Sequence, residues 1–140
     1  RVEFVRVFAA VGPVALPTEP GPDAFWSGVE GYYRDSAAAL ATRPQLAALV
    51  RGWLAASDNP ALARAQHEME QAVTPWIERL LDAGRAVGAV RTDLPSGLLI
   101  AVALGMGRAM DTWLMAQPLE GTAPPPIGAL VGMLRRALQP

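Results

Sequence analysis

Apolar side chains recur at helical spacing along most of this chain, and one stretch is apolar almost all the way round. On a helical wheel of residues 96–117, one apolar group falls together on one side: Leu98, Leu99, Val102, Met106, Ala109, Met110 and Trp113. A second apolar group falls on the opposite side, beside Gly107, Arg108 and Asp111: Ile100, Leu104, Leu114 and Met115. A helix that faced one core would need only one apolar stripe. The pattern therefore predicts a helix covered by its own domain on the first side and by a partner subunit on the second.

The same helical spacing predicts five further helices. Phe4 to Val11 form a short one that Gly12-Pro13 ends, and prolines between Pro17 and Pro22 indicate a stiff connector. The remaining four are predicted as follows: one with Asp23 as its N-cap and a stripe from Phe25 to Leu40, one from Pro44 to near Ser57, one from Asn59-Pro60 to about Val87, and one over 127–138. Pro75 should kink the third of these. With no strand-like alternation, the expected class is all-α with about six helices.

Composition narrows the class of protein without assigning a function. The chain has 140 residues, enough for one domain with its own core. It has no cysteine, which excludes disulfides and thiolate metal sites and fits a reducing cytosol. Its net charge of −1 creates no field that favours nucleic acid. The uncharged run from Leu94 to Gly107 is shorter than the roughly 20 residues of a membrane span, so no membrane association is expected.

The middle of the chain resembles the C-terminal domain of TetR-family transcriptional regulators. The resemblance lies in Gly84, Gly88, Arg91 and Asp93-Leu94, followed by a long apolar helix ending near Asp111, Trp113 and Leu114. The short helix after Pro44 and the long one after Asn59-Pro60 match the same layout, so the resemblance covers about residues 24–138.

The resemblance implies a cytoplasmic effector-binding and dimerisation domain, normally preceded by a helix-turn-helix domain that binds DNA. That DNA-binding part is absent from these residues. Residues 1–22 would then be a connecting segment, although their prolines depart from the family pattern, and residues 23–140 would be the domain itself. In the family, the last two long helices pair with their copies in a four-helix bundle, which here would use about 96–117 and 127–138. The resemblance and the wheel together give these interface candidates: Ile100, Leu104, Gly107, Arg108, Asp111, Leu114, Met115, Leu130, Met133 and Leu134.

Large aromatic and methionine side chains lie on the expected inner faces of several helices. They either fill an ordinary core or line a cavity for a small apolar or aromatic effector. With Ser36, a hydroxyl in the middle of an apolar stripe, the ligand-binding candidates are Trp26, Tyr33, Ser36, Trp53, Met69, Trp76, Met106, Met110 and Trp113. Ser36 has a second interpretation, a hydrogen bond to a carbonyl of its own helix.

Charged and small residues suggest structure more than chemistry. Arg108 and Asp111 are three residues apart and are expected to pair within their helix. Ala101, Gly105 and Ala109 form a small-residue ridge that would let another helix approach closely. No Ser-His-acid set, phosphate loop or HExxH motif can be assembled, so no enzyme, cofactor or metal is expected. Two functions remain open: a ligand sensor that alters operator binding, and a purely structural dimerisation module with a filled core. A third, an enzyme or lipid carrier with a helical-bundle fold, would need a convergent polar cluster within a pocket, and none can be constructed from these residues.

Overall fold

The computed structural model describes residues 20–55, 59–117 and 124–140. These residues form helices and no strand, which confirms the all-α class. The helices are α2 (Pro22–Ala41), α3 (Pro44–Ala55), α4 (Pro60–Ala86), α5 (Ser96–Ala116) and α6 (Ile127–Leu138). The helix expected in residues 4–11, and the connector up to residue 19, lie outside the described residues.

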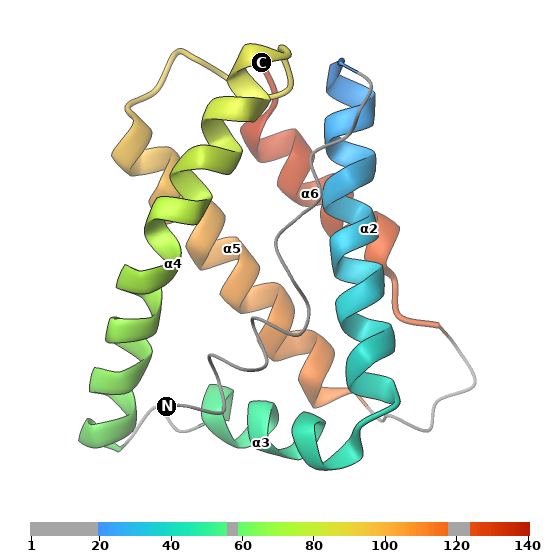
Figure 1. The fold of residues 1–140 in the computed structure, drawn as a ribbon, viewed down its shortest axis with the longest axis vertical. Helices are drawn as coiled ribbons and strands as arrows, with labels where there is room; N and C mark the ends of the chain where they lie inside the picture. The colour runs from blue at the N-terminus through green and yellow to red at the C-terminus, as the bar shows by residue number, and fades with distance from the viewer. Residues whose placement is uncertain (1–19, 56–58, 118–123) are drawn as a thin grey trace.

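Helix α5 runs diagonally behind α2 and α4, which stand apart in front of it (Figure 1). It contacts α3, α4 and α6, while α2 contacts α3 and α6. Helix α3 lies across one end of the molecule, and α6 lies behind α2. Three helices therefore surround the front face of α5: α2, α3 and α4.

The starts of α4 and α2 differ in how they are capped. The Asn59 side chain accepts a hydrogen bond of 3.0 Å from the Ala61 N–H, which confirms it as the cap of α4. The predicted Asp23 cap is wrong, because α2 begins one residue earlier at Pro22 and its N-cap is Gly21. Asp23 lies in the first turn instead, where its carboxylate pairs with Arg135 of α6 at 2.6 Å.

The turn after α4 depends on two glycines. Gly88 has a φ of 75°, a left-handed conformation that glycine adopts at little cost. The amides of Ala89 and Val90 then donate to the Gly84 carbonyl at 2.7 and 3.2 Å. Val90 of the returning chain and the Phe25 ring of α2 both pack against Gly84, so a Cβ there would overlap the Val90 side chain and lie 2.8 Å from the Phe25 ring.

This turn packs into the main core. The Trp26 indole N–H donates to the Ala89 carbonyl at 3.1 Å in the interior. The Arg91 amide donates to the Leu138 carbonyl at the end of α6 at 2.7 Å. The buried core cluster consists of Phe25, Trp26, Val29, Leu81, Ala89, Val90, Leu99, Met110, Ile127, Val131, Leu134 and Leu138.

The predicted orientation of α5 is confirmed only in part: Leu99 and Met110 are buried in the core, and Val102 and Met106 pack against it, as expected. Leu98 and Trp113, expected to face the core, are 49% and 46% exposed. Ile100 and Leu114, expected to face a partner, pack against the core cluster, and Met115 is buried. The helix is therefore turned so that the small-residue ridge, rather than the side carrying Arg108 and Asp111, faces outward: Ala101, Gly105 and Ala109 are exposed.

Candidate ligand site between α2, α4 and α5

Three aromatic rings from two helices meet in front of α5. Tyr32 and Tyr33 follow one another in α2, and their rings lie nearly perpendicular with centroids 5.8 Å apart. The Tyr32 ring also approaches Trp76 of α4, at 5.9 Å and an interplanar angle of 45°. Tyr32 thus connects the two helices that stand apart in Figure 1.

Asp111 supplies a carboxylate to the same region. A Cβ at Gly107 would lie 3.5 Å from the Tyr33 hydroxyl, so Tyr33 packs against α5 one turn before Asp111. Burial raises the pKa of both tyrosines, and the negative charge of Asp111 raises them further. Asp111 therefore lies near both tyrosines, although no hydrogen bond joins it to either.

The environment of Asp111 is poorly hydrated. Loss of water around its carboxyl group raises the pKa of Asp111 to about 6. Its side chain is nevertheless exposed by surface area. Both observations are consistent with a side chain that protein surrounds on most sides while part of its surface stays open. Within the part of the chain that the structure describes, Asp111 forms no ion pair.

The predicted pair of Arg108 with Asp111 is wrong, because Arg108 turns toward α4. Its guanidinium donates to the Gln66 side-chain oxygen at 2.9 Å and pairs with Glu70 at 3.2 Å. Gln66 in turn donates to the Trp53 carbonyl of α3 at 2.7 Å. A series of polar contacts thus links α3, α4 and α5.

The structure separates the other predicted ligand residues into three groups. Trp26 and Met110 are buried in the core. Trp113 lies on the outer face of α5, two residues from Asp111 and hence nearly opposite it on the helix. Trp53, Met69, Trp76 and Met106 are half-buried, as is Tyr33.

The Ser36 hydroxyl donates to the Tyr32 carbonyl at 2.7 Å. This confirms the interpretation that Ser36 makes a hydrogen bond within its own helix. Tyr32 was absent from the predicted ligand set. Its place on the apolar stripe from Phe25 to Leu40 pointed to it, but its contact with Trp76 joins residues far apart in the sequence and could not be inferred.

The predicted interface residues differ in how much surface they leave open to a partner. Met115 and Leu134 are buried within the chain and keep little surface for a partner, which corrects their assignment. Met133 is 45% exposed on α6. Arg108 and Asp111 are exposed but face the α4 and α2 side. The half-buried remainder, Ile100, Leu104, Gly107, Leu114 and Leu130, faces inward at least in part.

The structure also has a cavity that does not include the rings of Tyr32, Tyr33 and Trp76. A shallow cavity of about 170 Å³ lies between α4 and the start of α5, lined by Glu78, Leu81, Asp82, Arg85, Ser96 and Ile100. It is smaller than the roughly 300 Å³ of a small-molecule pocket. In the described ranges, no three His, Asp or Glu side chains are grouped to hold a metal ion.

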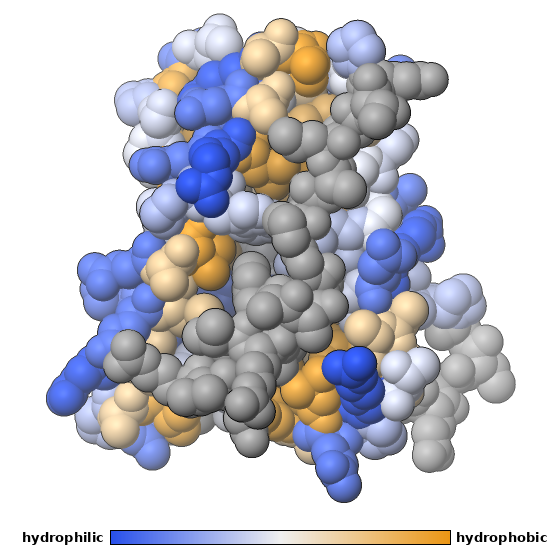
Figure 2. All heavy atoms as spheres, in the orientation of Figure 1, coloured by the Kyte–Doolittle hydropathy of each residue, from blue (hydrophilic) through white to orange (hydrophobic). Residues whose placement is uncertain are grey.

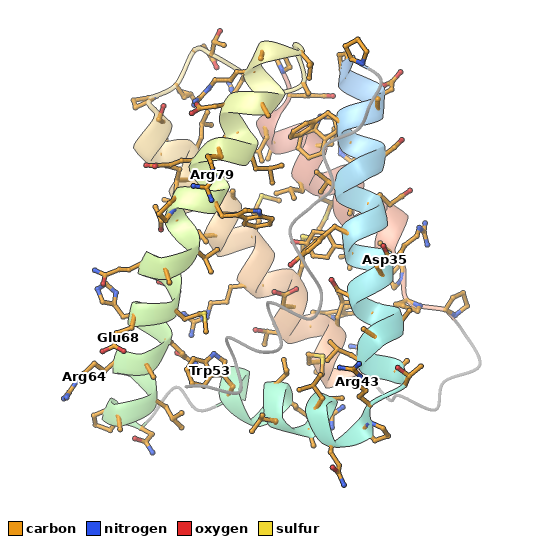
Figure 3. The ribbon with its side chains drawn as sticks, in the orientation of Figure 1. Asp35, Arg43, Trp53, Arg64, Glu68 and Arg79 are labelled. Atoms are coloured by element: carbon orange, nitrogen blue, oxygen red, sulfur yellow. The ribbon has the colours of Figure 1, made fainter. Side chains whose placement is uncertain are left out.

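Figure 2 shows hydrophilic side chains along the outer side of α4 and apolar ones between α4 and α2. In Figure 3, Arg64 and Glu68 point outward from α4, whereas Trp53 lies between α3 and the lower part of α4. Charged residues of α4 thus point away from the molecule, while Trp53 of α3 lies on the other side of α4.

Helix α5 is the one helix in the described residues that could cross a membrane by length and composition, and 17% of its most apolar stretch is buried within the chain.

Comparison of the chain with models of known protein families, with curated proteins and with solved structures found no match.

Proposed function

We propose that this chain is the ligand-sensing and dimerisation domain of a TetR-like transcriptional regulator in the cytoplasm. A small apolar or aromatic effector binds between α2, α4 and α5. Its binding favours one arrangement of a homodimer and so changes the operator affinity of a helix-turn-helix domain outside these 140 residues. The effect on operator binding is limited by the difference in effector affinity between the two arrangements.

The outer face of α5 is the observation that carries the proposal. Three of the large apolar side chains that are most exposed in the described residues belong to α5 and α6: Leu98, Trp113 and Met133. Leu98 and Trp113 flank the ridge of Ala101, Gly105 and Ala109. Exposed apolar surface of this kind is typical of a protein interface. The expected pairing of α5 and α6 with their copies is thus retained, through a different face of α5.

A lipid-facing α5 explains the same surface less well. Arg108 and Asp111 lie within the helix, and a charge at bilayer depth is costly. Arg108 is also engaged by Gln66 and Glu70 of α4 in the same chain.

Gly105→Glu tests dimerisation without disturbing the fold. Gly105 has open space around the position of a Cβ, so the new side chain meets nothing in its own chain. In an interface it would bury an unpaired charge, at a cost of several kcal/mol. We expect a dimer for the parent protein at micromolar concentration by sedimentation and a monomer for Gly105→Glu.

Gly52→Glu is the matched control, because Gly52 is also an exposed helical glycine with open space around it but lies on α3. It should leave the dimer intact. A monomeric parent protein, or a Gly105→Glu dimer as stable as the control, would contradict the proposal.

Tryptophan fluorescence distinguishes a sensor from a structural module. Trp53 and Trp76 flank the proposed site, so a bound effector should change their emission. Titration against a library of small hydrophobic compounds should give saturable changes for a sensor and flat traces for a module with a filled core.

A further inference from the structure

We propose that Tyr32, Tyr33, Trp76 and Asp111 form a binding site for an organic cation with an apolar body, such as a quaternary ammonium or a protonated amine on an aromatic skeleton. This inference rests on the proposed ligand-sensing function and narrows its effector class from apolar to apolar and cationic.

The aromatic rings supply the first half of the recognition. A cation is attracted to the face of a tryptophan or tyrosine ring when it lies within about 6 Å of the ring centroid. The Tyr32 centroid is 5.8 Å from that of Tyr33 and 5.9 Å from that of Trp76. The rings are perpendicular or tilted rather than stacked, so they turn different faces to their surroundings. An organic cation can contact two of them at once.

Asp111 supplies the second half, a negative charge that the described part of the chain leaves unpaired. The basic group closest in sequence, Arg108 three residues earlier, is held by Gln66 and Glu70 of α4. From α3, Arg51 donates to the Met115 carbonyl at 2.7 Å, one turn beyond Asp111. An incompletely hydrated carboxylate without a partner is costly. A cationic ligand between α2 and α5 would provide the missing partner.

The same arrangement selects against other ligands. An anion would meet the Asp111 charge in a poorly hydrated region, where repulsion is stronger than in water. A neutral isostere would keep the apolar contacts but lose both the ring and carboxylate attraction. Charge, rather than shape, is therefore the property by which this site distinguishes its ligands.

Two probes of nearly the same shape test the inference. Phenyltrimethylammonium and tert-butylbenzene differ in having N⁺ or carbon at the branched centre. We expect the parent protein to bind the cation about tenfold or more tightly than the hydrocarbon, by tryptophan fluorescence titration at pH 8. Asp111→Asn should reduce that preference to about the contribution of the rings, several-fold below the parent value, while hydrocarbon affinity stays unchanged.

Asp82→Asn is the control, because it removes the same charge from an exposed side chain near the end of α4, where Asp82 pairs with Arg85. It should leave both affinities unchanged. Trp76→Leu provides a second variant, which should weaken the cation more than the hydrocarbon. Far-UV circular dichroism checks that each variant is folded.

Equal binding of the two probes, unaffected by Asp111→Asn, would overturn the cation site while leaving an apolar effector pocket in place. Failure of the cation to bind at millimolar concentration would also overturn it. The broader ligand-sensing function fails only if the hydrophobic library also gives flat traces, so the two failures are distinguishable.

Discussion

At the scale of single residues, Asp111 combines an exposed side chain with a poorly hydrated carboxyl group. Its pKa of about 6 lies above the ordinary value of 3.8, so the folded protein holds this proton more tightly than the unfolded chain does. The associated stability is fully present below pH 3.8 and is lost as the pH rises through about 6. Above that range the ionised carboxylate is a constant cost to the fold.

Asp111→Asn should therefore stabilise the protein at neutral pH. After the pKa shift is discounted for the exposure of the side chain, we expect a gain of about 1 kcal/mol at pH 7, or roughly 2–4 °C in Tm. The gain should vanish near pH 4. Thermal melts of the two proteins at pH 4, 5, 6 and 7 measure it, and a constant difference across this series would contradict the assigned pKa.

Gly84 is the position where added volume should cost most. An alanine Cβ there would overlap the Val90 side chain and lie 2.8 Å from the Phe25 ring. We expect Gly84→Ala to lower the stability by about 1–3 kcal/mol, despite the higher helix propensity of alanine. Chemical denaturation measures the change.

Gly31→Ala is the control for this effect, because a Cβ at Gly31 has nothing within 4 Å. It should raise stability by about 0.5–1 kcal/mol. If both variants gained stability, the close approach of the turn after α4 to Gly84 would be refuted.

At the scale of elements, the loop between α4 and α5 is fastened to the end of α6. Arg91 holds both carboxylate oxygens of Asp93 at 2.7 Å and donates to the Ala137 carbonyl at 3.3 Å. The Arg91 hydrogen bond lowers the pKa of Asp93. The resulting stability is present above the ordinary pKa of 3.8 and is lost as the pH falls through the lowered value.

Arg91→Lys should loosen this fastening without unfolding the domain, because lysine cannot make the paired contact. We expect faster hydrogen exchange at the amides of residue 91 and of the last turn of α6, and a smaller loss of Tm than for Gly84→Ala. Exchange at the α2 amides serves as the internal reference. Uniformly faster exchange would mean that the whole fold, and not this junction, had been weakened.

Helix α5 shows where inference from sequence succeeded and where it failed. Pro95 and Pro118 bracket the helix, so its predicted extent of 96–117 is close to the observed Ser96–Ala116. Its orientation could be inferred only in part, because a helix apolar on both sides has no single stripe to turn inward. The sequence pattern places Arg108 and Asp111 on the outer side, yet both face neighbouring helices.

At the scale of the whole molecule, the order of helices α2 to α6 was predictable but the contacts between them were not. Asn59, Pro44 and the glycines near 84–88 act locally, so the sequence alone located the ends of α3 and α4. The approach of Tyr32 to Trp76 depends on how α2 and α4 cross α5, and no local pattern encodes it. The candidate site was therefore predicted only in part, through Tyr33 and Trp76.

The proposed dimer predicts a specific pattern of cross-links along α5. The chain has no cysteine, so a single introduced thiol has no competitor. If α5 crosses its copy along the small-residue ridge, cysteines near the crossing point lie close to their own symmetry mates. A disulfide needs Cα atoms about 4.4–6.8 Å apart, a spacing that small side chains between two helices allow.

We therefore expect Ala101→Cys, Gly105→Cys or Ala109→Cys to form a disulfide-linked dimer under mild oxidation, with yield falling on either side of one position. Gly52→Cys on α3 should give only the background yield. Equal yields from all four variants would mean random collision, and α5 would then lose its assignment as the dimer helix.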